Sequence, residues 1–354
     1  FRAEIFSKAF GSELEENIVV PPQAERAKLY VDTCIETVTK QGLNILGSQA
    51  GYIAIPLSGQ PNLVNPFGRS LDLFGAGSGA VPFWFTETES GVQENQIPAK
   101  EEMQTALAAY IDENLLDCLN GFKPLQNQGY GFEESQPQSR VSINERNVLV
   151  QTTYPFTIIK DDFTFTFSQF RKNIKSNIGK LYNEAVQIMA KESQEYFLEE
   201  RALDMMAVYD SVPFSGIDTE CVPRTWLQTN VQKEAKKIFA ANFPSLRIAG
   251  SKYKEHENDP KSFLIDALDE DTDTSVLFTY DEQWPLLMDV VGENEEILRA
   301  KPFTAENAAS RFLLPLFCMN DNHFVYDMKF PMLISLQEGD SMFQYATLVV
   351  IDNN

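Results

Sequence analysis

The spacing of apolar residues changes within residues 141–191, and this stretch predicts the centre of the fold. Phenylalanine alternates strictly with threonine from Phe163 to Phe167, which is the period of two typical of a half-buried strand. Two further apolar runs start at Val141 and Val148, and a polar Glu-Arg-Asn turn separates them. Three such runs in succession predict an antiparallel meander.

After these strands the period lengthens to three or four residues, which is the spacing of one face of an α-helix. The apolar positions on this face are Phe170, Ile174, Ile178, Leu181, Ala185 and Ile188. Several lysines and Glu184 lie off the apolar stripe. A helix of this kind covers one face of a sheet. We therefore predict that it packs on the meander and that its stripe belongs to the core.

Helical spacing also precedes the meander, and β-type spacing follows it. One helix is predicted from Pro22 to about Gly47 and another from Pro98 to Asn120. A shorter helix is predicted from Trp226 to Phe243, and strong strands close the chain at Phe324–Leu336 and Phe343–Ile351. The predicted fold class is therefore α+β, with an N-terminal helical layer, an antiparallel meander covered by a long helix, and a β-rich C-terminal half.

The same patterns predict how the chain divides into domains. Residues 1–20 form an acidic lead-in that we expect to follow an anchor lying upstream of the sequence. Residues 21–210 form a domain of helices and the meander, and residues 211–354 form a β-rich domain with one or two helices. No repeat with a period of about 20 to 50 residues is visible, so we do not expect a repeat array.

Proline interrupts three of the β runs in the same way, after an aromatic residue and before an apolar one. The triplets are Tyr154-Pro155-Phe156, Trp284-Pro285-Leu286 and Phe330-Pro331-Met332. Proline has no N–H group to donate to a ladder, so each triplet predicts an edge, a bulge or a bend in its sheet. We interpret the triplets as structural corners rather than as a platform for a ligand.

The charge of the chain narrows the choice of partner. With 51 acidic and 29 basic residues, the formal net charge is −22. Binding to nucleic acid or to an anionic membrane surface needs a basic stripe, which the sequence lacks. No apolar run reaches the length of about 18 residues that a membrane span needs. We therefore expect a protein or a surface glycan as partner, and contact with a membrane only through the upstream anchor. The pattern favours no particular oligomeric state.

The one short match to a catalytic motif is SxxK at residues 251–254, which we interpret as a chance match. There are two histidines, and no HExxH, GxSxG or P-loop pattern is present. Fifty-one acidic residues always offer carboxylate pairs for hydrolysis, but nothing in the pattern selects one of them. We therefore assign no catalytic residue and expect a protein that is not an enzyme.

Three aspartates form the one candidate metal site. Asp269, Asp271 and Asp273 occupy alternate positions, as the first ligands of a calcium loop do. An EF-hand loop would then need glycine at its sixth position and glutamate at its twelfth, where this chain has Thr274 and Tyr280. Two interpretations stay open, an acidic tip between strands and a weak calcium site. No other cofactor is expected.

The four cysteines are widely spaced and form no CxxC pair, which argues against a zinc ribbon. They are compatible either with two disulfides or with four buried thiols. Cys34 and Cys118 lie on the apolar stripes of two predicted helices, so packing of those stripes brings the sulfurs within reach. The first disulfide we predict is therefore Cys34–Cys118, which leaves Cys221–Cys318 as the second.

Four segments together resemble a known group of proteins. They are residues 34–53 (CIETVTKQGLNILGSQAGYI), 212–226 (VPFSGIDTECVPRTW), 323–336 (HFVYDMKFPMLISL) and 343–354 (FQYATLVVIDNN). They are similar to a family of membrane-anchored ectodomains, without an assigned activity, from small-genome archaea of the DPANN group. The resemblance implies one membrane helix before Phe1, β-rich modules after Asn354, and an extracellular location on the cell surface. That location would favour disulfides, and the family carries no catalytic residues to transfer.

These observations lead to one expected function and two alternatives. The expected function is a non-catalytic ectodomain on the cell surface, with a role in contact, adhesion or envelope architecture. The first alternative is a secreted hydrolase of glycans or peptides that uses a carboxylate pair. The second is a subunit of a self-assembling surface filament or sheath, against which the proline-interrupted strands argue mildly.

Overall fold

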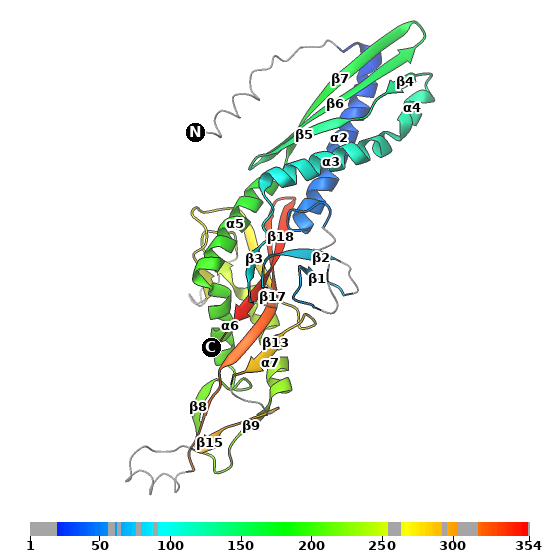
Figure 1. Cartoon of the computed structure of the whole chain (residues 1–354). Helices are drawn as coiled ribbons and strands as arrows, with labels where there is room; N and C mark the ends of the chain where they lie inside the picture. Colours follow the sequence, from blue (N-terminus) through cyan, green and yellow to red (C-terminus); the bar gives the residue numbers. More distant parts are fainter. Residues whose placement is uncertain are drawn as a thin grey trace.

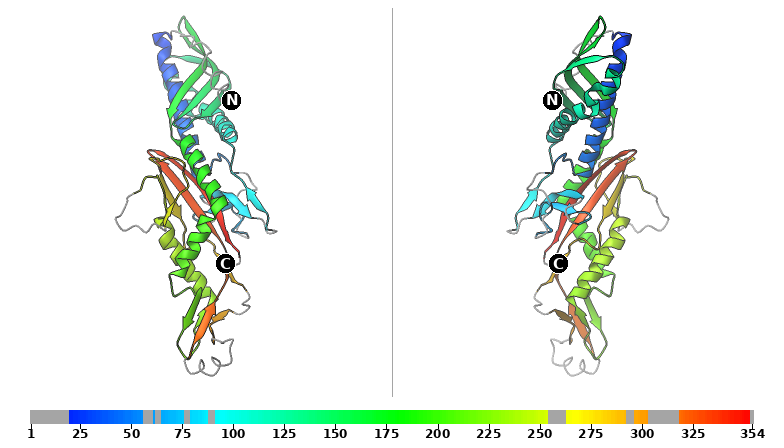
Figure 2. Two further views of the ribbon diagram at one scale, coloured as in Figure 1. Left: turned by 90° about the vertical axis from the view of Figure 1, so that its left-hand side faces the viewer. Right: turned by 90° about the vertical axis from the view of Figure 1, so that its right-hand side faces the viewer.

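The computed structural model describes residues 20–55, 61, 65–75, 79–87, 91–253, 263–291, 296–302 and 318–352. The molecule is elongated, with one sheet at its upper end, a second across its middle and short strand pairs at its lower end (Figure 1). Two further views show the same long axis (Figure 2). Among the described residues, no helix is both long and apolar enough to cross a membrane.

Helices and strands contribute in similar measure, which confirms the predicted α+β class. The helical segments are α2 Pro22–Ser48, α3 Lys100–Leu119, α4 Lys123–Gln126, α5 Ile178–Glu195, α6 Phe197–Ala207 and α7 Gln228–Asn242, with 3₁₀ turns η2 Asn120–Phe122 and η3 Phe243–Ser245. The first strands are β1 Ser70–Asp72, β2 Ala80–Glu87, β3 Gln93–Asn95, β4 Gly131–Glu134, β5 Gln138–Ile143, β6 Asn147–Lys160, β7 Phe163–Lys175, β8 Ser215–Asp218 and β9 Thr225–Leu227. The remaining strands are β10 Arg247–Ile248, β11 Leu264–Ile265, β12 Ser275–Thr279, β13 Leu287–Val290, β14 Ile297–Arg299, β15 Lys301–Pro302, β16 Asn320–His323, β17 Tyr326–Glu338 and β18 Ser341–Ile351.

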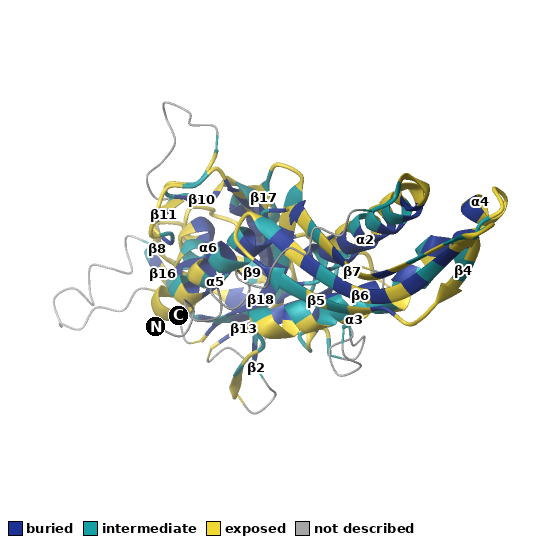
Figure 3. Ribbon diagram, turned by 90° about the horizontal axis from the view of Figure 1, so that it is seen from above, coloured by how far each residue is buried: buried dark blue, intermediate teal, exposed yellow. Residues whose placement is uncertain are grey.

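The upper sheet is the predicted antiparallel meander. Strand β6 lies in the middle, with β7 along one side and with β4 and β5 sharing the other side. Buried and exposed residues alternate along β6, so one face of the sheet is core and the other faces solvent (Figure 3). The ladder between β6 and β7 shifts register between Thr153 and Phe156. This irregularity spans Pro155 and agrees with the predicted structural corner.

The predicted long helix is wrong at its start and in what it covers. Phe170 and Ile174 belong to β7, and α5 begins only at Ile178. A spacing of four residues is even, so it keeps side chains on one face of a strand as well as on one face of a helix. Helix α5 packs on β17 and β18, whereas α2 and α3 pack against β7 and β5 of the meander.

The central sheet joins segments from opposite ends of the chain. Its strand order is β1-β2-β18-β17-β12, with β13 also paired to β17 and β3 paired to β2. The β2–β18 pair is parallel, and the other pairs of this sheet are antiparallel. The sheet therefore takes strands from both sides of the boundary that we placed near residue 210. A cut there does not separate two independent sheets.

Trp84 on β2 holds three parts of the central layer together. Its side chain is fully buried, and its ring stacks on Tyr345 of β18 with the ring centroids 4.1 Å apart. The indole Nε1 donates a hydrogen bond of 3.0 Å to the carbonyl oxygen of Ala50, just beyond α2. A buried indole N–H needs such a partner, so this contact fixes the end of α2 against the sheet.

Candidate functional site

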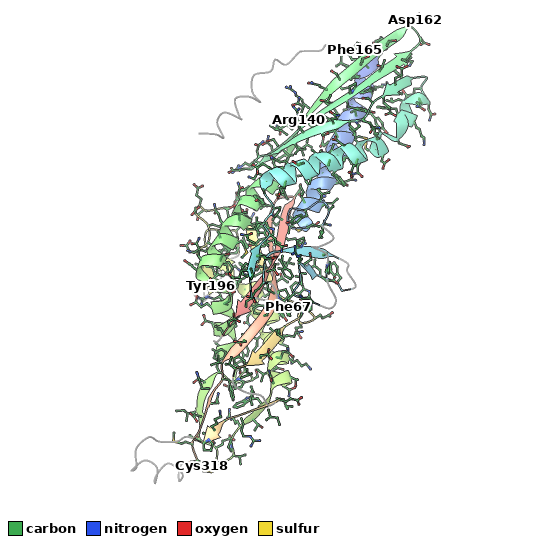
Figure 4. All side chains as sticks on the ribbon, viewed as in Figure 1. Phe67, Arg140, Asp162, Phe165, Tyr196 and Cys318 are labelled. Atoms are coloured by element: carbon green, nitrogen blue, oxygen red, sulfur yellow. A yellow bond between two sulfur atoms is a disulfide. The ribbon has the colours of Figure 1, made fainter. Side chains whose placement is uncertain are left out.

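Both predicted disulfides are present, which confirms the pairing. Cys34 of α2 is joined to Cys118 of α3 with their Cα atoms 5.7 Å apart. Cys221 is joined to Cys318 with a Cα separation of 4.4 Å. Cys318 lies at the lower end of the molecule (Figure 4). Paired cysteines are typical of proteins in an oxidising environment.

The structure gives no support to the predicted calcium site. Asp269, Asp271 and Asp273 are all exposed. Within the part of the chain that is described, no group of three or more His, Cys, Asp or Glu side chains could hold a metal ion. The Asp271 side chain lies against Gly250, where an added Cβ would come within 2.6 Å of its Oδ1 atom. The acidic turn therefore packs against a neighbouring turn, which agrees with the interpretation as an acidic tip.

A different pair of acids meets inside the protein, where α5 ends and α6 begins. Tyr196 separates the two helices and has a left-handed backbone with a φ of 52°. This turn directs the N-terminus of α6 toward the last turn of α5. The Glu192 carboxylate accepts a hydrogen bond of 3.1 Å from the Leu198 N–H of that N-terminus. Glu192 thus caps the helix that follows its own.

The second acid, Glu199, reaches the same place from the first turn of α6. Its carboxyl group lies close enough to that of Glu192 for the two groups to share a hydrogen bond. Its Oε1 atom also accepts a hydrogen bond of 3.4 Å from the Val350 N–H of β18. Two carboxyl groups can share a hydrogen bond only when one of them carries a proton. The contact therefore describes a carboxyl pair that holds a proton between its members.

Burial is the main reason that this pair keeps its proton. Glu192 is 6% exposed, and burial together with the nearby Glu199 charge raises its pKa well above the usual glutamate value. Burial likewise raises the pKa of Glu199. Tyr345 of β18 faces the pair, and burial followed by the Glu192 charge raises the pKa of its hydroxyl. The site therefore favours a neutral Tyr345 hydroxyl and one proton held by the carboxyl pair.

A small open cavity adjoins the pair. The space open to the centres of water molecules is about 50 Å³. Its lining residues are Phe85, Gln93, Met189, Glu192, Ser193, Tyr196, Glu199, Thr347, Leu348 and Val350. Figure 4 marks Tyr196 on the side of the molecule where the two helices meet. No lysine or arginine is among these residues, so no cation from the described part of the chain lines the cavity.

Three buried oxygen atoms beside the pair have no hydrogen-bond donor or acceptor among the described residues. They are Oε2 of Glu199, the hydroxyl of Tyr345 and Oγ1 of Thr347. Buried polar atoms in native proteins are almost always satisfied, by protein groups, water or a bound ligand. The proton of the pair can satisfy the Glu199 oxygen. Thr347 lines the cavity, so a molecule bound there can reach its hydroxyl.

The apolar stripe of α5 contains a sequence signal for this site, although the predicted stripe stopped at Ile188. Continuing the stripe from Leu181 through Ala185 and Ile188 leads directly to Glu192. A carboxylate at a core position of an amphipathic helix is unusual and calls for an explanation. Glu184, which we placed off the stripe, is also buried at 8% exposure. No sequence spacing indicates that Glu199 meets Glu192, because the turn at Tyr196 brings them together.

The carboxyl pair leads to a prediction about pH. In the unfolded chain both acids ionise near a pH of about 4.3, whereas the folded protein retains a proton because the pKa is raised. This contribution to stability is complete below the unfolded pKa. It is lost as pH rises toward the folded pKa, by up to about 1.4 kcal/mol per pH unit for one proton. Glu192→Gln should remove that slope and raise the urea midpoint measured at about pH 8.

Glu338 offers a matched control with the opposite sign. Burial pushes its pKa up, but hydrogen bonds and charge from Lys180, with help from Thr274, hold it below the usual value. Its contribution to stability is therefore present at neutral pH and is lost in acid. Glu338→Gln should lower the urea midpoint at neutral pH. A Glu192→Gln variant that kept the pH slope of the unmodified protein would contradict the shared proton.

Comparison of the chain with known protein families, with curated proteins and with solved structures found no match. The resemblance to archaeal membrane-anchored ectodomains therefore stays a prediction. The function has to be inferred from the surfaces and sites of the molecule itself.

Proposed function

We propose that this protein is a non-catalytic ectodomain at the cell surface, and that it makes contacts through the solvent-facing side of its upper sheet. One observation carries the proposal. Arg140 of β5, Gln151 of β6 and Arg171 of β7 lie directly opposite one another across the three strands. Both arginines are exposed, and neither forms an ion pair with any other described residue. A protein this acidic has many carboxylates available to neutralise them, yet this row is left open.

The charge of the residues around this row differs from that of the rest of the chain. Residues 138–175 hold six basic and three acidic residues, whereas the whole chain has a net charge of −22. Two of the six are engaged elsewhere, because Lys172 pairs with Glu36 at 3.5 Å and Lys160 lies over the ring of Tyr130 at 4.2 Å. The row of Arg140, Gln151 and Arg171 therefore carries a local positive charge that suits an acidic protein or glycan surface, while Glu133 of β4 is an exposed acid on the same sheet.

The shape and the disulfides support a position outside the cytoplasm. The upper sheet lies at one end of the long axis, where a partner can reach its outer face (Figure 1). Cys34–Cys118 fastens the two helices that cover its inner face, and Cys221–Cys318 fastens the opposite end. Such bridges form and persist in oxidising compartments and are rare in the cytosol.

The geometry of the buried carboxyl pair does not favour a hydrolase that uses these two residues. Glycosidases hold their two carboxyl groups about 5 to 9.5 Å apart so that a sugar and a water fit between them. Glu192 and Glu199 instead touch through a hydrogen bond, beside a cavity of about 50 Å³. The two carboxyl groups leave no room for a sugar ring between them.

One observation favours self-assembly as a second candidate function. Strand β7 pairs only with β6 within the described structure, so one long edge of the upper sheet stays open. The strand has 13 residues and contains no proline. Open edges of this length can pair with another chain. Sedimentation of the purified protein would show whether its molecules associate in this way.

Removing the two open arginines should weaken binding to the surface of the cells that make the protein. The variant carries Arg140→Ser and Arg171→Ser, and we expect bound protein at a fixed concentration to fall at least about fivefold because charge complementarity is lost. Both side chains are exposed, so the free energy of unfolding should change by less than about 0.5 kcal/mol. Binding is measured with fluorescent protein on intact cells.

The control removes the same amount of charge from the other end of the molecule. Lys233→Ser with Arg299→Ser changes two exposed cations and should leave binding unaltered. Equal binding by both double variants would refute the contact face. The location is tested separately by labelling intact cells with an amine reagent that does not cross membranes. Labelling of this protein only after lysis would refute an extracellular position.

A further inference from the structure

The cavity beside the carboxyl pair, which we call the pocket, has features of a ligand-binding site. It contains two carboxyl groups and a buried hydroxyl, and no basic residue that the structure describes lines it. Thr347 is 1% exposed, and its Oγ1 atom has no hydrogen-bond partner among the described residues. A buried hydroxyl that lines a cavity beside two acids can accept a hydrogen bond from a ligand bound there.

Gln93 and Ser193 also line the pocket, and most of the remaining wall is apolar. Phe85 comes from β2, Met189 from α5 and Leu348 from β18, and Tyr196 lies at the open side. A hydrated metal ion gains nothing from such walls, because hard cations need about six oxygen ligands or waters. A short alkyl chain gains by leaving water against them. The pocket thus combines acceptors at its base with an apolar passage.

We propose that this pocket binds the primary ammonium group of an alkylamine ligand, with Glu192, Glu199 and Thr347 accepting its hydrogen bonds. An ammonium group has three N–H donors and no acceptor, which matches three oxygen acceptors that no described lysine or arginine contacts in the pocket. The alkyl chain lies against Phe85 and Met189 and leaves the pocket past Tyr196. The site accepts a free amine or the end of a lysine side chain, which share this chemistry.

Binding has a defined proton balance. The empty pair holds one proton, and the ammonium takes over its role of joining the two carboxylates. Binding near neutral pH therefore releases one proton to solvent for each ammonium bound. The groups that face the site are Glu192 and Ser193 from α5, Glu199 from α6, Tyr345 and Thr347 from β18, and Gln93 from β3. Only the carboxyl pair among them titrates between acid and neutral pH, so affinity should rise with pH.

The inference does not depend on the function proposed above, because a small amine can enter this pocket in any compartment. It is tested on the purified full chain with n-butylammonium chloride, using isothermal titration calorimetry in two buffers of different ionisation enthalpy. We expect saturable binding with one site, release of about one proton, and affinity at least tenfold higher at about pH 8 than at about pH 5.

Two other probes distinguish hydrogen bonding by the ammonium group from the effect of charge alone and of hydrophobicity alone. Tetramethylammonium has the charge without N–H donors, and n-butanol has the chain without the charge. Neither should bind measurably. Binding of tetramethylammonium as tight as that of n-butylammonium would overturn the proposal, as would saturable binding of calcium ions that n-butylammonium does not displace. A free amine and a lysine side chain are then distinguished with an acetylated, amidated lysine as the probe.

Substitutions in the pocket test whether the ligand binds there. Glu199→Gln and Thr347→Val should each weaken n-butylammonium binding at least tenfold while the unfolding curve without ligand stays cooperative. Glu200→Gln changes the exposed acid that follows Glu199 on α6 and should leave the affinity unchanged. Full affinity in the Glu199→Gln variant would refute this site. Absence of any saturable binding by the unmodified protein would refute it as well.

Discussion

Replacing both Cys34 and Cys118 with alanine should lower the free energy of unfolding by about 3–5 kcal/mol. The bridge joins residues 84 apart in sequence, so its loss lets the unfolded chain explore many more conformations. Cys34 is also 3% exposed, and its removal leaves a space between two helices. Urea denaturation followed by circular dichroism, without reductant, gives the change in midpoint.

The other disulfide provides the comparison. Cys221 and Cys318 are 97 residues apart, so chain entropy alone predicts a loss of similar size when both become alanine. Adding reductant to the Cys34→Ala/Cys118→Ala variant should produce a further loss of stability, because the second bridge then opens too. A Cys34→Ala/Cys118→Ala variant with the midpoint of the unmodified protein would contradict the first bridge.

Trp84→Ala should destabilise the protein by about 3–5 kcal/mol, the cost typical of removing a fully buried large aromatic side chain. The substitution removes the ring that stacks on Tyr345 and takes away the donor to the Ala50 carbonyl oxygen. Both losses fall where α2, β2 and β18 meet. The change is measured by urea denaturation with far-UV circular dichroism, which does not depend on tryptophan fluorescence.

Two further variants separate the causes. Trp84→Phe keeps most of the ring packing but leaves the Ala50 carbonyl without its donor, so about 1–3 kcal/mol should be lost. Trp226→Ala removes a half-buried tryptophan at the lower end and should cost less than Trp84→Ala. If Trp84→Ala and Trp226→Ala cost the same, Trp84 does not hold the central layer together.

The location of the carboxyl pair shows how a site can form from parts that no motif connects. Glu192 and Glu199 are seven residues apart, a spacing that keeps two residues on the same face of an uninterrupted helix. Here the left-handed turn at Tyr196 breaks the helix, and the N–H groups of α6 then face Glu192. The strand that completes the site, β18, comes from the other end of the chain. Packing therefore creates the chemistry of this pocket.

The sequence by itself determined several of the elements and one of their long-range links. Alternation from Phe163 to Phe167 identified β7, and the stripes on α2 and α3 placed Cys34 and Cys118 within reach of each other. Such features depend on the period of apolar residues within one element, which is local information. The α+β class follows from the same periods.

Only the tertiary structure decided which faces meet. The series from Phe170 to Ile174 satisfied both a helix and a strand, and pairing with β6 resolved it as strand. The parallel pairing of β2 with β18 and the meeting of Glu192 with Glu199 were equally absent from the local pattern. Many apolar faces compete for partners in a chain of this length, and the outcome depends on burial summed over the whole fold. That sum is a property of the packed molecule, and no short stretch of the sequence contains it.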